Sequence, residues 1–151
     1  MNAPVKIRTA ERRDHDAWLP LWRGYQTFYK VDLGDEVTRR TWERFHDPAE
    51  PMHCAVAEQP DGRLVGMVHY IFHRSCWMVN DSCYLQDLFA APEVRGQGVG
   101  RALIEHVYAR AAEAKSPRVW WLTHESNHTA MQLYDRIADR SGFVQYRKAI
   151  G

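Results

Sequence analysis

A glycine-rich turn in the middle of the chain has the residue types of an anion-binding site. A short apolar run over residues 84–91 ends in a proline turn, and Arg95, Gly96, Gly98 and Gly100 follow it. The next stretch repeats its apolar residues at helical spacing. A strand, a glycine turn and a helix in this order direct several free backbone N–H groups and the positive end of the helix dipole at one spot. The sequence therefore predicts that the turn binds a phosphate or pyrophosphate.

The spacing of these glycines excludes two common phosphate motifs. The dinucleotide fingerprint needs a third glycine three residues after the second, and Arg101 occupies that position. The mononucleotide loop needs a Gly-Lys-Ser/Thr run, which the sequence lacks. A tight strand-to-helix turn that binds no ligand is the alternative at this point.

The charge balance argues against recruitment to nucleic acid or to a membrane surface. The 151 residues carry 20 basic and 19 acidic side chains, for a net charge of +1. No apolar run approaches the length of about 18 residues that a membrane span needs. The first residues become charged without the apolar segment of a secretory signal. Cys54, Cys76 and Cys83 fit reduced thiols, so we expect a cytoplasmic protein.

The hydrophobic patterns predict one α/β domain over residues 1–151. The predicted order is strand, two helices, three strands, helix, strand, helix and strand. This order gives a mixed, mostly antiparallel sheet with helices on both faces. Residues 59–62, Gln-Pro-Asp-Gly, are predicted as a hairpin turn. The predicted strands cover 5–9, 54–58, 63–73, 82–90, 118–123 and 143–149, and the predicted helices cover 14–30, 36–45, the stretch from the glycine turn to about 114, and a segment that opens at 127.

Two segments resemble the GNAT superfamily of N-acetyltransferases. Arg95-x-x-Gly98-x-Gly100 is similar to its acetyl-coenzyme A signature, Arg/Gln-x-x-Gly-x-Gly/Ala. The run from Asn127 to Tyr134, Asn-x-x-Ala-x-x-Leu-Tyr, is similar to a later segment of the family. Residues 21–29 and the Thr-His-Glu-x-Asn run are similar to a subgroup of histone, polyamine or D-amino-acid acetyltransferases. The resemblance implies the GNAT fold, acetyl transfer from acetyl-CoA to a primary amine in a ternary complex, no metal, and a homodimer.

The resemblance also implies where the acetyl-CoA cosubstrate binds. Its pyrophosphate would lie on the backbone N–H groups from Gly96 to Arg101. Its pantetheine arm would follow residues 88–90, where the next parallel strand splays away in this family. A backbone N–H near Leu88 or Phe89 would then face the thioester oxygen. The residues implied in coenzyme binding are Leu88, Phe89, Ala90, Arg95, Gly96, Gln97, Gly98, Val99, Gly100, Arg101, Asn127 and Tyr134.

Three residues are candidates for the chemistry. The resemblance places Tyr134 beside the sulfur, where its phenol would stabilise the departing thiolate by a hydrogen bond. Asp87 on the central strand and Glu125 at the end of the neighbouring strand are candidates for accepting the proton of the amine. Each is explained equally well as a solvated or structural charge. The diamine-acetylating relatives usually carry Glu where this chain has Gln86, which leaves the base open.

The first two helices would form one wall of the groove for the acceptor amine. Aromatic side chains there could stack on a cation, and the acidic loop between the helices could attract one. Ordinary helix packing and an exposed loop explain the same residues. A non-catalytic coenzyme A-binding module is the alternative function, which Gln86 permits. The predicted substrate-binding residues are Trp22, Tyr25, Tyr29, Asp32, Asp35 and Gln86. His53, His69 and His73 lack further ligands, and no metal is expected.

Overall fold

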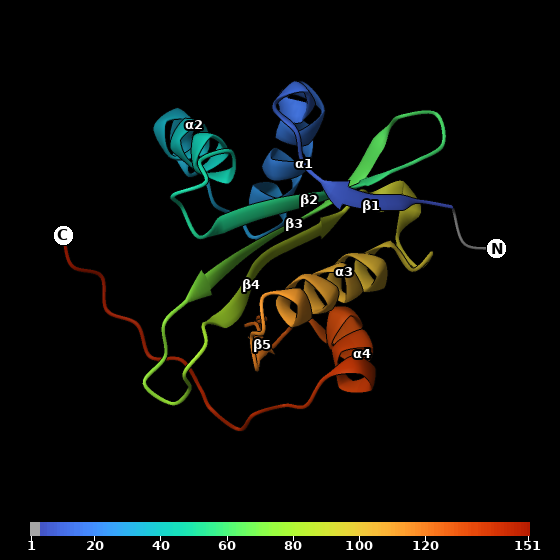
Figure 1. Ribbon diagram of the computed structural model, residues 1–151. Helices are drawn as coiled ribbons and strands as arrows, with labels where there is room; N and C mark the ends of the chain where they lie inside the picture. Colours follow the sequence, from blue (N-terminus) through green and yellow to red (C-terminus); the bar gives the residue numbers. More distant parts are fainter. Residues whose placement is uncertain (1–3) are drawn as a thin grey trace. The chain divides into compact units, whose positions relative to one another are not determined.

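Five strands form one sheet in the order β1-β2-β3-β4-β5 (Figure 1). The computed structural model of the protein describes residues 4–151. Neighbouring strands are antiparallel except for the β4–β5 pair, which is parallel. The mixed, mostly antiparallel sheet predicted from the sequence is therefore confirmed. The strands are β1 Lys6–Thr9, β2 Met52–Glu58, β3 Leu64–His73, β4 Ser82–Ala90 and β5 Val119–Trp120.

The predicted hairpin joins β2 to β3. The Gln59 N–H donates to the Arg63 carbonyl at 2.8 Å, and the Gly62 N–H donates to the Gln59 carbonyl at 2.8 Å. Gly62 has a φ of +89°, which a residue without a Cβ adopts at little cost. The local Pro-Asp-Gly sequence therefore sets the register of the two central strands.

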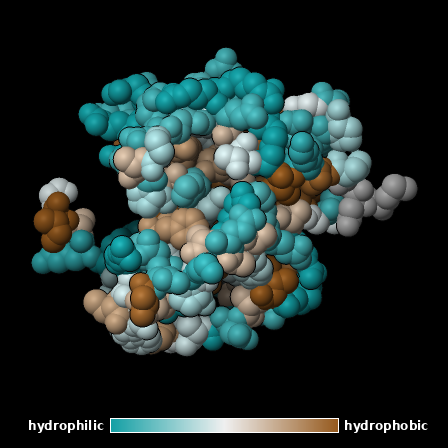
Figure 2. All heavy atoms as spheres, viewed as in Figure 1, coloured by the Kyte–Doolittle hydropathy of each residue, from teal (hydrophilic) through white to brown (hydrophobic). Residues whose placement is uncertain are grey.

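Helices cover both faces of the sheet (Figure 1). Helices α1 (His15–Phe28) and α2 (Gly34–Phe45) lie on one face, and α3 (Val99–Glu113) lies on the other. A Cβ on Gly66 of β3 would lie 3.0 Å from side-chain atoms of Val99 and Leu103, so a glycine allows α3 to pack closely. The outward faces of α1 and α2 are hydrophilic (Figure 2). Short 3-10 turns precede α1 and α3, at Arg12–Asp14 and Pro92–Val94.

The core contains aromatic residues on the α1 side and aliphatic residues on the α3 side. Trp18 is fully buried, and its ring centroid lies 4.6 Å from that of Trp42. The Trp22 indole N–H donates to Thr38 Oγ1 at 3.0 Å, which ties α1 to α2. Leu103, Ile104 and Val107 of α3 have no exposed surface, as the helical period predicts. Within residues 4–151, no helix has the length and apolar character needed to cross a bilayer.

The last part of the chain forms a second compact unit, Leu122–Gly151, which we describe by itself. Helix α4 spans His128–Ile137 and confirms the helix predicted to open at Asn127. The predicted strand over residues 143–149 is wrong, because residues 138–151 adopt no strand. Phe143, Val144 and Tyr146 are 79%, 77% and 94% exposed. Alternating apolar residues are not sufficient for a strand, because a strand also needs a second backbone with which to form hydrogen bonds.

The predicted strand over 118–123 is shortened to the two residues of β5. The same reason applies, since pairing with β4 extends only over Cys83–Val119 and Tyr84–Trp120. The assignment of residues 1–151 to a single domain stays a prediction.

A cluster of ionic groups fixes β1 against the turn that leads into α1. Arg8 donates to both carboxylate oxygens of Asp14 at 2.7 and 2.9 Å and to Glu58 Oε2 at 2.7 Å. The Asp14 carboxylate also accepts the Glu11 backbone N–H at 2.7 Å. The hydrogen bonds from Arg8 hold the pKa of Asp14 below its ordinary value. A bidentate pair of this kind orients the β1 exit and α1 together.

We predict that Asp14→Asn lowers the free energy of unfolding by about 2 kcal/mol at pH 7, because it leaves a half-buried guanidinium without its main partner. Since the pKa of Asp14 is lowered by folding, its contribution is present above the ordinary pKa of 3.8 and is lost as the pH falls through the lower folded value. The difference from wild type, measured by urea unfolding, should therefore shrink below about pH 4. Asp16→Asn, at a fully exposed carboxylate in the first turn of α1, is the control and should change stability little. Equal stability of the two variants at pH 7 would contradict the prediction.

Candidate active site

The glycine turn connects the end of β4 to α3 through backbone conformations that favour glycine. Gly96 has a φ of +78°, and Gly98, the residue before the helix, has a φ of +85°. A Cβ at either position would strain the left-handed backbone. The turn therefore needs these two glycines for its own geometry, before any ligand is considered.

The turn presents backbone N–H groups without internal acceptors. Within residues 4–151 we find no hydrogen-bond acceptor for the N–H groups of Gly96 and Gly98 or of the first three residues of α3. The first internal bond of the helix runs from Ala102 to the Gly98 carbonyl at 3.0 Å. A Cβ on Gly96 or Gly100 would meet no atom within 4 Å, so the space beside the turn is open. This arrangement has the properties of an anion site at a helix N-terminus.

Gln97 differs from the other residues of the glycine turn, because its backbone N–H has an acceptor within the turn. The Gln97 N–H donates to the Val94 carbonyl at 3.3 Å, and its side chain donates to the Glu93 carbonyl at 3.2 Å. Its backbone N–H is therefore used inside the turn. Gln97 holds the shape of the loop, and the glycines and the first turn of α3 carry the free donors.

Arg95 is held on the aromatic surface at the end of β4. Its Nε donates to the Ala90 carbonyl at 3.1 Å, and the guanidinium lies 5.3 Å from the Phe89 ring centroid and 5.7 Å from that of Phe28. No carboxylate among the described residues forms an ion pair with it. Arg95 therefore adds a positive charge beside the turn in an orientation that the two rings fix.

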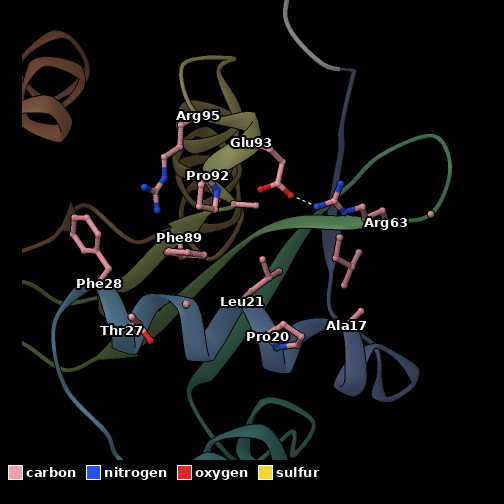
Figure 3. Close-up of a pocket in the computed structure, with 14 residues that line it drawn as sticks. Ala17, Pro20, Leu21, Thr27, Phe28, Arg63, Phe89, Pro92, Glu93 and Arg95 are labelled. Carbon is pink, nitrogen blue, oxygen red and sulfur yellow. Dashed lines mark hydrogen bonds and ion pairs between the residues drawn. The ribbon is translucent and has the colours of Figure 1, made fainter.

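A groove of about 680 Å³ lies between α1 and the end of β4 (Figure 3). Phe28, Phe89 and Arg95 line one end, and Arg63 and Glu93 form an ion pair at the other. A Cβ on Gly24 would lie 2.7 Å from Phe89 Cζ, so α1 approaches β4 closely at this point. Phe89, which the family resemblance implies in binding the pantetheine arm, is among the residues that line this groove.

Strand β4 has one edge that is only partly paired. It pairs with β3 from Ser82 to Ala90, whereas β5 pairs with only its Cys83 and Tyr84. Beyond Tyr84, no strand of the described chain pairs with this second edge. Leu88, Phe89 and Ala90 are half-buried on this stretch. Backbone groups are thus available for an extended ligand to bind in the manner of another strand.

A bulge at Gln86 sets which side chains of β4 share a face. Asp87 pairs with His69, whereas the next partner along β3, Tyr70, pairs with Leu85, so Gln86 is the extra residue. Tyr84 pairs with Ile71, two residues from His69, and therefore lies on the same face as Asp87. Uninterrupted alternation would place residues 84 and 87 on opposite faces.

Asp87 is buried on the α1 face and is surrounded by hydrogen-bonding groups. It is 8% exposed, whereas the bulged Gln86 beside it is exposed. The His69 Nδ1 lies 2.9 Å from Asp87 Oδ2. Burial, the charge of Asp87 and a hydrogen bond to it raise the pKa of the Tyr25 phenol far above its ordinary value. Burial and Asp87 also raise the pKa of Tyr84. The Asp87 carboxyl group thus lies among aromatic side chains, Tyr25 and Tyr84 included.

The other predicted acceptor residues divide into buried and exposed ones. Trp22 is 4% exposed and lies in the helix–sheet core, which gives its ring a packing role. The Tyr29 ring lies 4.9 Å from that of Tyr25 and is partly exposed. Asp32 and Asp35 are exposed near the start of α2, where Asp32 accepts the Gly34 N–H at 3.0 Å. Within this group, the Tyr25 phenol interacts with Asp87.

Sequence reasoning missed Tyr84, and it considered His69 only as a metal ligand. Among the residues that the structure describes, no group of three potential ligands could hold a metal ion. His69 faces α1, whereas His53 pairs with Tyr70, the next residue of β3, and stacks on its ring. No local pattern in the sequence identifies Tyr84 or His69 as a neighbour of Asp87, because their positions beside it depend on the bulge and on strand pairing.

Three predicted residues lie in the second unit. Glu125 is exposed in the loop before α4. Asn127 precedes the helix, and its side chain makes no capping hydrogen bond but donates to Thr123 Oγ1 at 3.3 Å. Tyr134 is half-buried on α4. Their catalytic and binding roles stay predictions.

Comparisons with known proteins agree on one family. A sequence model of the acetyltransferase (GNAT) family matches residues 17–138. The chain is 37% identical over 149 residues to a D-amino-acid N-acetyltransferase of Saccharomyces cerevisiae, covering 98% of this chain and 92% of the relative. It is 35% identical over 141 residues to a thialysine N-epsilon-acetyltransferase of Bos taurus, covering 88% of this chain and 82% of the relative.

Solved structures agree with the fold. A probable acetyltransferase superposes with a TM-score of 0.85 at 25% identity, covering 97% of this chain and 98% of the other. An aminoglycoside N-acetyltransferase solved in complex with CoA has a TM-score of 0.81 at 16% identity, covering 99% of this chain and 98% of the other. The second likeness concerns the fold alone.

We predict that Gly98→Ala weakens coenzyme A binding about ten-fold, because a Cβ in the left-handed conformation costs about 1–2 kcal/mol and displaces the free N–H groups. Gly142→Ala is the matched control. Gly142 also has a left-handed backbone, with a φ of +88°, and open space around it, so alanine should cause a similar local strain and leave coenzyme A binding nearly unchanged. Titration calorimetry with coenzyme A and thermal unfolding measure the two effects. Wild-type affinity in Gly98→Ala would contradict the role of the turn.

Proposed function

Because the chain belongs to the acetyltransferase (GNAT) family, we propose that it moves an acetyl group from acetyl-CoA to the primary amine of a polyamine, an amino-acid-like molecule or a peptide lysine. The amine attacks directly while both substrates are bound. The observation that carries this proposal is the row of free N–H groups at the end of β4, on the same strand as a buried carboxylate. One rigid element thus supplies an anion site and a proton acceptor.

Acetyl-CoA supplies the activated thioester, and the protein supplies the groups that bind it. Gly96, Gly98 and the first residues of α3 bind the pyrophosphate, with Arg95 beside them. The unpaired edge of β4 along Leu88–Ala90 binds the pantetheine arm. A backbone N–H of this stretch donates to the thioester oxygen as it becomes an oxyanion. One such donor is typically worth about 3 kcal/mol in the transition state.

Asp87 accepts the proton of the attacking amine. A lysine-like amine with a pKa near 10.4 costs about 4.6 kcal/mol to deprotonate at pH 7, so a base within reach is needed. The ammonium first gives one proton to the carboxylate, and the neutral nitrogen then forms the new bond to the acetyl carbon as the carbon–sulfur bond breaks. The second proton that the nitrogen loses passes to the departing thiolate, which leaves as the free thiol. Tyr134 stabilises the departing thiolate. Burial favours Asp87 over the exposed Glu125, because a carboxylate in a dry site interacts more strongly with a cation.

The names of two relatives support a small amine as the acceptor. The proteins of Saccharomyces cerevisiae and Bos taurus are named for a D-amino acid and for thialysine, which both carry a primary amine. The neutral aromatic surroundings of Asp87, Tyr25 and Tyr84 among them, fit an ammonium group. The homodimer and the cytoplasmic location stay predictions from the sequence.

We expect acetyl-CoA-dependent thiol release with at least one member of a panel of D-amino acids, thialysine and spermidine. Asp87→Asn should lower kcat/KM for that amine about 100-fold, because the amide cannot accept the proton. Asp16→Asn is the exposed control and should retain wild-type rates. Coenzyme A binding without turnover on any amine would instead indicate the non-catalytic binding module.

Tyr134→Phe should lower turnover at least about ten-fold with little change in the affinity for coenzyme A, because only the hydrogen bond to the leaving thiolate is removed. Tyr146→Phe removes a phenol that is 94% exposed in the same unit and serves as the control. Steady-state kinetics and calorimetry separate the two parameters. A wild-type rate in Tyr134→Phe would remove the role proposed for this residue.

A further inference from the structure

A buried chain of hydrogen bonds connects α1, β3 and β4. The Trp18 Nε1 lies 3.0 Å from His69 Nε2, and His69 Nδ1 lies 2.9 Å from Asp87 Oδ2. The three residues are 0%, 2% and 8% exposed. Nothing in the catalytic step described above uses Trp18 or His69. Two polar groups buried at this depth need a reason other than packing.

The indole fixes the direction of both hydrogen bonds. An indole N–H can only donate, so His69 Nε2 must accept, and the imidazole proton lies on Nδ1. Nδ1 then donates to the Asp87 carboxylate. A second proton on Nε2 would face the Trp18 N–H donor. His69 is thus held as one neutral tautomer and cannot take the proton of the amine while the bond to Trp18 exists.

We propose that Trp18 and His69 are positioning residues that hold Asp87 in the orientation in which it accepts the amine proton. This inference rests on the proposed function. The roles of a serine-protease triad are exchanged here: there a carboxylate orients a histidine base, whereas here a histidine orients a carboxylate base. A neutral donor fixes the carboxylate without the full positive charge of an arginine, which would favour the ionised form and weaken it as a base.

Aromatic rings and a thiol surround His69 and Asp87 in this chain of bonds. On the α1 side are Trp22, with its ring centroid 5.2 Å from that of His69, and Tyr25. Helix α2 contributes Phe45, whose ring centroid lies 4.6 Å from that of His69. From the sheet, Cys54 of β2 pairs with His69, and Tyr84 lies on the Asp87 face. Burial is the main cause that raises the pKa of Tyr25, Cys54 and Tyr84, so all three are neutral at pH 7.

Two amide variants of His69 separate positioning from packing. Asparagine places its amide nitrogen where Nδ1 lies, and glutamine places it where Nε2 lies. We expect His69→Asn to keep kcat within about three-fold of wild type and His69→Gln to lower kcat at least about ten-fold, with the KM for acetyl-CoA unchanged in both. The acceptor is the best amine of the panel. Equal losses in the two variants, or wild-type kcat in His69→Gln, would overturn the proposal.

The tautomer gives a readout that needs no turnover. Ring ¹⁵N NMR of the wild-type protein should show the neutral His69 ring with its proton on Nδ1. Trp18→Phe removes the donor and should allow a second tautomer or a second proton, with a loss in kcat. Trp42→Phe is the matched control, since its ring centroid lies 4.6 Å from that of Trp18 and the described chain gives its indole no hydrogen bond.

The two readouts distinguish the possible failures. If no amine is acetylated but the Nδ1 tautomer is found, the proposed function fails and the hydrogen-bonded chain stands. If the enzyme turns over and His69 carries its proton on Nε2, the proposed function stands and the positioning role is overturned. A Trp18→Phe variant with wild-type kcat and an unchanged tautomer would overturn it as well.

Discussion

A carboxylate buried between a sheet and a helix must be surrounded by hydrogen-bond donors, and Asp87 imposes this requirement on the elements around it. His69 and Tyr25 supply donors, and Trp18 fixes the donor on His69. Trp18 and Tyr25 lie seven residues apart, on one face of α1. By lying over the sheet, α1 therefore contributes to the hydrogen bonding around Asp87 as well as to the hydrophobic core. The aromatic side chains of α2 exclude water from the same region.

Strand β4 connects the Asp87 carboxyl group to the glycine turn. Its pairing with β3 over the whole strand makes it rigid, and its brief pairing with β5 leaves the second edge available. The strand then ends in the turn whose N–H groups lack internal acceptors. A donor that binds at the turn and follows the unpaired edge reaches the region of Asp87 without leaving the strand. Because Asp87 lies on β4 and the glycine turn follows the same strand, this one strand sets the distance between them. Precise positioning of a ligand requires such a rigid connection.

The sequence predicts well those features that a short segment encodes. The 59–62 hairpin, the glycine turn and the amphipathic α3 each depend on local backbone geometry or on a helical period, and the structure confirms all three. The strand predicted over 143–149 fails for the opposite reason, because a strand exists only where a second backbone pairs with it. Trp22 shows the same limit for side chains. An aromatic residue at helical spacing gives the same sequence pattern whether it lines a groove or packs in the core. The hydrogen bond from Trp22 to Thr38 shows that Trp22 packs in the core.

By itself, then, the sequence determines the order of the elements as far as α4, the glycine turn and the family resemblance, since each is encoded by neighbouring residues. The tertiary structure alone decides the bulge at Gln86, which brings Tyr84 and Asp87 onto one face. It also decides the partners of His69, which lie 18 and 51 positions away in the chain. The physical reason is that one inserted residue and a hydrogen bond between distant segments leave no periodic pattern. They arise only when strands and helices pack, and the buried environment of Asp87 arises with them.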